Sequence, residues 1–269
     1  MQTKPRTVFR FTCGGFFEGY DTAEVLETDA GYKLRCEHGP FDVRETTSDL
    51  PAGKVEKLRR YIDAEVNGKW YCRYEANVLD GTQWELFDGS LERYGSNLFP
   101  QGFGDLTCFL ARELGCQGFD ECGDAFETEL DERQELEILA FYGFLLPDAE
   151  CQEDRGGGDD EDDWDDEDGE EAAGTEMAAR QLHHDLHLFL DRHPEYKDYG
   201  RILAENGMPL VVDQIKAHDV RDASPECIVA MVLAMSRADH FDGRSDVFGT
   251  CAKDGTFGRW LARLGAALG

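Results

Sequence analysis

Basic residues are scarce in this chain of 269 residues, in which 27 Lys and Arg face 57 Asp and Glu, so the formal net charge is −30. An electrostatic field of that sign repels phosphates and anionic lipids, which argues against direct nucleic-acid binding. Long apolar runs are missing too, since none approaches the roughly 20 residues that span a bilayer. Residues 1–10 lack the apolar core of a secretion signal. We therefore expect a cytoplasmic protein with no membrane partner.

Paired cysteine motifs and familiar catalytic motifs are also absent. The nine cysteines are an odd number and include no C-x-x-C, which excludes a secreted disulfide framework or a zinc ribbon. The glycine-rich segment 13–19 lacks the Lys-Ser/Thr pair of a phosphate loop and the spacing of a dinucleotide fingerprint. It is typical of a turn between strands. We identify no catalytic residue and expect no cofactor.

Potential metal ligands occur without a complete set. Cys36 and His38 offer two ligands, and no complementary pair stands near them. His183 and His187 are four residues apart on one expected helix, with Asp191 a further turn along. A zinc site usually takes four ligands, often contributed in pairs. The sequence therefore predicts no metal site, and His187 and Asp191 are expected to face water.

The negative charge is concentrated in one part of the chain. Residues 147–176 contain 16 acidic residues and one basic residue, while residues 1–100 contain 17 and 13. Within the acidic part, Gly156, Gly157 and Gly158 precede a run of Asp and Glu that contains no aliphatic residue. Such a segment cannot bury enough surface to offset its ordering entropy, so we expect a disordered acidic linker over 147–174.

Two interpretations of this acidic run remain open. It can be a solubilising spacer between domains, or it can bind a basic surface of another protein, with its single aromatic ring as an anchor. Presenting carboxylates where phosphates would sit could inhibit a nucleic-acid-binding protein, as anti-defence inhibitors and other DNA mimics do. The function that we favour from the sequence is therefore a non-enzymatic interaction protein. Its expected partner-binding residues are Asp159, Asp160, Glu161, Asp162, Asp163, Trp164, Asp165, Asp166, Glu167 and Asp168.

The flanking regions have different secondary-structure signals. Residues 1–146 mix alternating strand patterns with helical ones, which predicts an α+β domain with a mainly antiparallel sheet. Residues 175–269 predict a small all-helical domain, with Ser224 and Pro225 as the clearest helix start. In the first domain we expect strands at 7–12, 22–28, 32–36, 70–76 and 83–87, and helices beginning near Pro51 and Pro100 and spanning 129–145.

An aromatic hairpin supplies the alternative function. Aromatic rings and polar side chains cluster around an expected Asp-Gly turn, and such surfaces can hold a small ligand. The same rings can equally form the core of the sheet. The candidate ligand-binding residues of this hairpin are Trp70, Tyr74, Asn77, Asp80 and Trp84, and the alternative is an enzyme or a small-ligand-binding protein that uses them.

The end of the chain has a recognisable pattern. The segment 236–243 reads Ser-Arg-Ala-Asp-His-Phe-Asp-Gly, and it is followed by an Asp-Gly step and a leucine-containing last helix. Residues 200–269 thereby resemble an uncharacterised bacterial family of helical domains with an R-A-D-x-F core. The resemblance implies a small helical domain and no known activity. Arg237, Asp239 and His240 are the candidate site residues here. Arg237, Asp239 and Asp242 are expected to form a buried ion-pair and helix-capping set, and a ligand site is the alternative.

Overall fold

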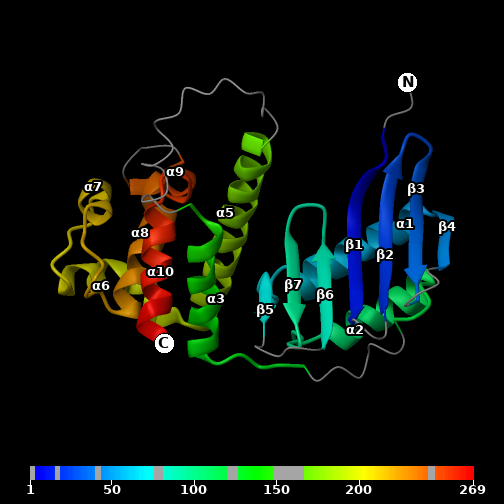
Figure 1. Cartoon of the computed structure of the whole chain (residues 1–269), viewed down its shortest axis with the longest axis horizontal. Coiled ribbons are helices and arrows are strands. Elements are labelled where there is room, and N and C mark those ends of the chain that lie inside the picture. The colour runs from blue at the N-terminus through cyan, green and yellow to red at the C-terminus, as the bar shows by residue number, and fades with distance from the viewer. Residues whose placement is uncertain are drawn as a thin grey trace. The chain divides into compact units, whose positions relative to one another are not determined.

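The computed structural model describes residues 4–15, 19–39, 44–75, 81–119, 127–147, 167–241 and 246–269. It divides into two compact units, Met1–Glu129 and Leu130–Gly269 (Figure 1). Asp159 to Asp166, Asn77, Asp80 and Asp242 lie outside the described residues, as do the side chains of Glu167, Asp168, Asp239 and His240. The expectations attached to these residues are therefore not addressed by the structure.

Unit 1 contains a seven-stranded mixed sheet, so the chain has an α+β fold. The strand order is β4-β3-β2-β1-β6-β7-β5, and the neighbours are antiparallel except for the parallel pair β5 and β7. The strands are β1 (Arg6–Gly15), β2 (Gly19–Thr28), β3 (Gly31–His38), β4 (Arg44–Leu50), β5 (Arg73–Glu75), β6 (Thr82–Phe87) and β7 (Glu92–Ser96).

The glycine-rich segment joins β1 to β2, as expected. Gly15 pairs with Gly19 at the end of the hairpin. A Cβ at Gly14 would lie 2.0 Å from the carbonyl oxygen of Gly19, so a larger residue would displace the backbone of the partner strand. The close approach of the two strands therefore explains the glycine at position 14.

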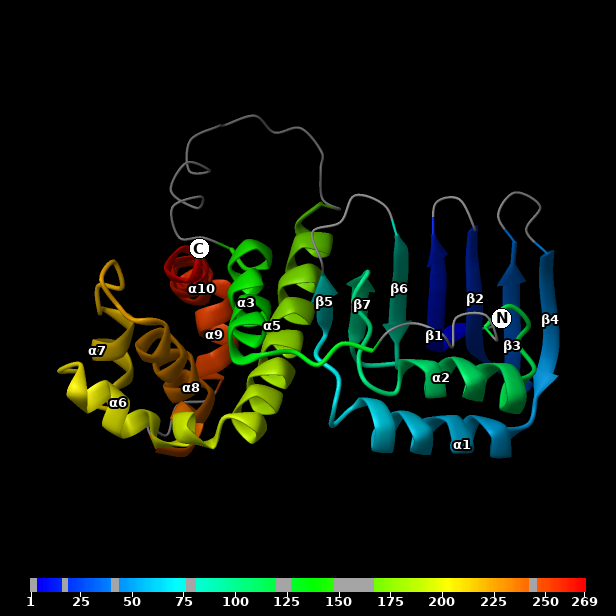
Figure 2. The same cartoon turned by 90° about the horizontal axis from the view of Figure 1, so that it is seen from below.

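Two helical segments cover one face of the sheet (Figure 2). The first is α1 (Ala52–Tyr61), continued by the π-helical turn η1 (Ile62–Val66), and the second is α2 (Phe103–Phe109), continued by η2 (Leu110–Leu114). The ring of Phe103 packs against that of Phe11 on β1, with centroids 5.7 Å apart. The core of unit 1 lies between these helices and the sheet.

Every regular element in the described part of unit 2 is a helix. Asp131 forms a capping box with Gln134 at the start of α3 (Glu132–Leu145). The Ser224 hydroxyl accepts from the backbone N–H of Cys227 at the start of α8 (Pro225–Phe241). No helix in the described ranges has the length and apolar character needed to cross a bilayer. The helices are α3 (Glu132–Leu145), α5 (Glu167–Arg192), η5 (Pro194–Asp198), α6 (Tyr199–Glu205), α7 (Val212–Lys216), α8 (Pro225–Phe241), α9 (Val247–Lys253) and α10 (Thr256–Leu268).

Helix α3 belongs to unit 2, whereas the sequence suggested that the first domain extends to residue 146. α3 runs beside α10 in both views (Figures 1 and 2). A Cβ at Gly143 would lie 2.4 Å from the backbone nitrogen of Ala262, which shows how closely the two helices approach. Hydrophobic patterning reveals that α3 has a buried face, but it cannot show which unit buries that face.

Helix α5 also begins earlier than expected. It starts at Glu167, inside the segment expected to be linker up to residue 174. Carboxylates in the first turn of a helix are stabilised by the helix dipole, and Ala172 and Ala173 follow as strong helix formers. The extreme acidity of 167–171 is therefore compatible with a helix start.

Candidate functional site

The aromatic rings of the expected hairpin lie in the core of unit 1. Trp70 and Trp84 are each 1% exposed and Tyr74 is 2% exposed. The indole N–H of Trp70 donates to the Gln101 carbonyl oxygen, and that of Trp84 donates to the Leu98 carbonyl oxygen, each at 2.8 Å. These rings support the sheet and present no open face to a ligand.

The candidate residues on α8 do not form a buried ion pair around Arg237. The Arg237 side chain is exposed, while Ala234, Met235 and Ala238 take the buried positions of this helix. Asp239 and His240 continue the helix, and only their backbone is described. The expectation of a buried Arg237 is wrong because position 237 lies on the outer face of α8, whereas positions 234, 235 and 238 face the core.

The histidine pair of α5 has no third ligand near it among the described residues. The rings of His183 and His187 are 4.6 Å apart. Burial, supported by the positive charge of Arg237, lowers the pKa of both histidines. His187 is half-buried instead of facing water, and Asp191 is exposed and contacts Lys197.

Cys36 and His38, on β3, turn to different partners. The Cys36 thiol contacts the thiol of Cys116, and the His38 ring contacts the carboxylate of Asp21. These four side chains do not converge on a common point that could hold a metal.

A cavity of about 220 Å³ lies beside α1 in unit 1. Apolar and polar side chains both line it, and Asp88, whose side chain is 3% exposed, is the more buried of its two carboxylates. That carboxylate already accepts hydrogen bonds from Ser90, Leu91 and Arg93. The polar side chain is therefore engaged in holding its own loop, which favours a structural role.

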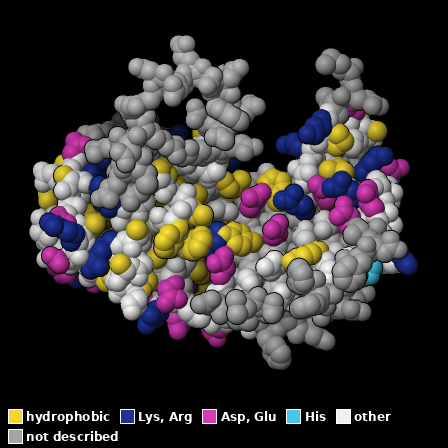
Figure 3. Space-filling view, in the orientation of Figure 1, with side chains coloured by type: hydrophobic (Ala, Val, Ile, Leu, Met, Phe, Trp, Pro, Cys, Tyr) yellow, Lys and Arg dark blue, Asp and Glu magenta, His cyan; other side chains and the backbone are white. Residues whose placement is uncertain are grey.

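The most exposed large hydrophobic residue in the described chain is on α3. Phe144 is 80% exposed and Leu145 is 37% exposed. The half-buried ring of Phe141 lies one turn before Phe144, with centroids 5.9 Å apart. Residues 141, 144 and 145 are called the α3 patch below, and Figure 3 shows hydrophobic side chains gathered over this helix.

The position of the α3 patch follows from the way α3 packs. Leu136, Leu139, Ala140 and Gly143 form the face that meets the rest of unit 2, and α10 lies against it. The apolar end of α3 is evident in the sequence, but core and surface residues are equally apolar there. Only the contact with α10 shows that Phe144 lies on the outer side.

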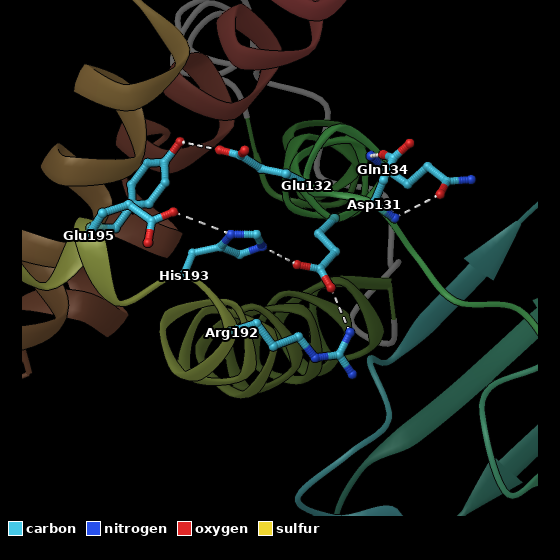
Figure 4. A network of polar contacts seen from close by, with 8 residues as sticks. Asp131, Glu132, Gln134, Arg192, His193 and Glu195 are labelled. Atoms are coloured by element: carbon cyan, nitrogen blue, oxygen red, sulfur yellow. Dashed lines mark hydrogen bonds and ion pairs between the residues drawn. The ribbon is translucent and has the colours of Figure 1, made fainter.

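A polar network fixes the other end of α3 (Figure 4). The buried carboxylate of Glu135 accepts from Arg192, 2.6 Å away, and contacts the ring of His193 at 2.5 Å. The Tyr196 hydroxyl donates to Glu132 at 3.0 Å. Burial, with the hydrogen bond to Glu132 and the nearby carboxylates, raises the pKa of Tyr196. α3 is thus held rigidly against the end of α5 and η5.

The charges of the described surface are mixed. Acidic and basic side chains are interspersed on the face drawn in Figure 3. Half of the net charge of −30 lies in the acidic part of the sequence, residues 147–176, whose first carboxylate, Asp148, comes three residues after the α3 patch.

Comparison with known proteins gives no relative: no family model, curated protein or solved structure matches this chain. The resemblance of residues 200–269 to a bacterial helical family stays a prediction. Any functional assignment therefore depends on the surfaces and clusters of this chain itself.

Proposed function

We propose that the protein is a non-enzymatic interaction protein that binds a basic surface of another protein. The observation that carries this proposal is the position of the α3 patch, where exposed Phe144 and Leu145 lie immediately before the acidic part of the chain. Exposed aromatic side chains beside charged residues are typical of interaction surfaces.

The two features would have separate physical roles. Burying the Phe144 ring in a pocket of the partner would contribute about 1.5–3 kcal/mol, and this contribution would act mainly on the dissociation rate. The acidic residues 148–171 would attract a basic partner over a distance and speed the encounter. Trp164 would be a second anchor within this charged segment.

The expected partner is a nucleic-acid-binding protein. Its basic groove would accept carboxylates in the place of phosphates, so that the complex would block access to nucleic acid. In this proposal residues 147–166 form a solvated acidic segment, and residues 130–269 act as a helical domain that presents it. The alternative function, a ligand site at the hairpin, has no comparable support because Trp70, Tyr74 and Trp84 are buried.

Kinetic measurements with matched variants test this proposal. Partners captured with the full chain are identified, and their association and dissociation rates are measured at several salt concentrations. Phe144→Ala should speed dissociation, whereas Leu210→Ala, a change at another exposed residue of unit 2, should have no effect. A neutral Gly/Ser replacement of 159–171 should slow association and flatten its salt dependence. Unchanged rates in both test variants would refute the proposal.

A further inference from the structure

A nitrogen and two carboxylates converge at the corner where α5 ends. His193 lies between α5 and η5, Glu195 is in the first turn of η5, and Glu132 is in the first turn of α3. Each offers one ligand atom, and these three atoms lie within 4.8 Å of one another. Two segments that are distant in sequence, the start of α3 and the turn from α5 into η5, thus bring metal-ligand chemistry to one place (Figure 4).

Glu135 orients the His193 ring. The ring Nε2 lies 2.5 Å from a carboxylate oxygen of Glu135, whose side chain is 3% exposed and also paired with Arg192. This contact occupies Nε2 and leaves Nδ1 as the ring nitrogen that can ligate an ion.

Nδ1 of the same ring faces a second carboxylate. Nδ1 of His193 lies 3.5 Å from a carboxylate oxygen of Glu195. A histidine that ligates a metal through one nitrogen and donates from the other to a buried carboxylate is the usual arrangement in metal sites, and the Glu135–His193 pair has this geometry.

The surrounding contacts hold the ligands in place. The backbone N–H of His193 donates to Phe189 at 2.8 Å, and the two rings pack with centroids 4.5 Å apart. The Tyr196 hydroxyl orients the Glu132 carboxylate. Glu195 is exposed, so its side chain can rotate to bring its oxygen to coordination distance.

We propose that Glu132, His193 and Glu195 bind a divalent first-row cation, with Zn²⁺ as the best match to one imidazole and two carboxylates. Glu135 is a positioning residue, because it touches the ring of His193 and not the ion. Water would complete the coordination, since Glu132 and Glu195 are open to solvent. The bound ion would tie α3 to η5.

Zinc titration of the full chain tests this inference. Chelator-treated protein is titrated with Zn²⁺ against a chromophoric chelator, in salt with millimolar Mg²⁺ to occupy the acidic segment. All variants carry Cys36→Ser and Cys116→Ser, so that these neighbouring thiols do not contribute to the Zn²⁺ signal. We expect one tight Zn²⁺ per chain, with Glu195→Gln and His193→Gln each weakening binding at least about tenfold.

Two further variants separate ligands from other effects. His187→Gln, in the other histidine cluster of α5, should leave the affinity unchanged. Glu135→Gln should weaken binding about ten- to a hundredfold while the absorption spectrum of bound Co²⁺ keeps its shape, because the ligand set is the same. Since Glu195 is exposed, its substitution does not threaten folding. Wild-type affinity in Glu195→Gln and His193→Gln, or no stoichiometric Zn²⁺ in the parent protein, would overturn the inference.

Discussion

The Cys36 Sγ atom on β3 lies 3.2 Å from the Sγ atom of Cys116, which follows η2. The hydrogen bond between the two thiols lowers the pKa of Cys36 by more than burial raises it. The same hydrogen bond, together with burial, raises the pKa of Cys116. Cys36 is half-buried and Cys116 is buried. The more accessible thiol is therefore also the one that more readily becomes a thiolate.

We expect diamide to oxidise this pair to a disulfide, with the two thiols losing two hydrogens and diamide gaining them. Peptide mapping should find Cys36 linked to Cys116, and the cross-link should raise the stability of unit 1 by about 2–4 kcal/mol. Cys108→Ser is the matched control, because Cys108 is half-buried but is not part of the pair. The absence of the linked peptide after oxidation would contradict this prediction.

Asp88→Asn should strongly destabilise unit 1. Asp88 pairs at 2.7 Å with Arg93, whose side chain is 0% exposed, so the substitution leaves a buried guanidinium without a counter-charge. Breaking a buried pair in this way costs about 3–5 kcal/mol. Denaturant unfolding measures the change, and Glu65→Gln, at an exposed i,i+4 pair, should cost at most about 0.5 kcal/mol. Equal effects of the two substitutions would contradict the prediction.

The same pair gives a pH dependence. Burial alone would raise the pKa of Asp88, but the charge of Arg93 and the hydrogen bonds outweigh it, and the pKa is lowered. The folded carboxyl thus stays charged below the ordinary value of about 3.9. Its stabilisation is complete above that value and is lost as the pH falls through the folded pKa. Stability curves of wild type and Asp88→Asn should therefore converge only in strong acid.

Two glycine substitutions in unit 2 should have opposite signs. Gly143→Ala would place its Cβ 2.4 Å from the backbone of α10 and should lower the melting temperature. Gly174→Ala, in α5, meets no atom within 4 Å and should stabilise the helix by about 0.5–1 kcal/mol. Thermal unfolding compares them. If both raise the melting temperature, α3 does not pack on α10 as described.

A cut within the acidic segment should not separate the chain. In this test a specific protease site replaces residues 155–158, so that after cleavage α3 belongs to the N-terminal fragment. Because α3 packs against α10 and Glu135 pairs with Arg192 and His193, the two fragments should co-elute on gel filtration and separate only in denaturant. Separation in native buffer would show that α3 is not part of unit 2.

Local signals in the sequence identified much of the fold. The glycine-rich end of β1, the turn before Gly31 and the helix start at Pro225 each have a short-range physical cause that is visible in the residues. β4 was missed because only Leu50 among its residues is buried, so it has no alternating hydrophobic pattern. β7 was missed because the buried Gly95 carries no side chain, which leaves room for the Trp84 indole.

The candidate sites depend on tertiary contacts, so the sequence revealed less of them. Glu135 and His193 are 58 residues apart, and no local pattern pairs them. Phe144 shares an apolar stretch with residues that are buried, and only the packing of α10 separates exposed from buried positions. The charge concentration, in contrast, needs no folding to be recognised.

The membership of α3 in unit 2 has a mechanical consequence. If the two units were pulled apart by their partners, the tension would pass through the chain near residues 129 and 130, where the units divide. The acidic segment would carry no load, because α3 and α5, which flank it, belong to the same unit. A force that pulls the two units apart would therefore stretch the chain near residues 129 and 130. The distance between the two ends of the acidic segment would stay the same.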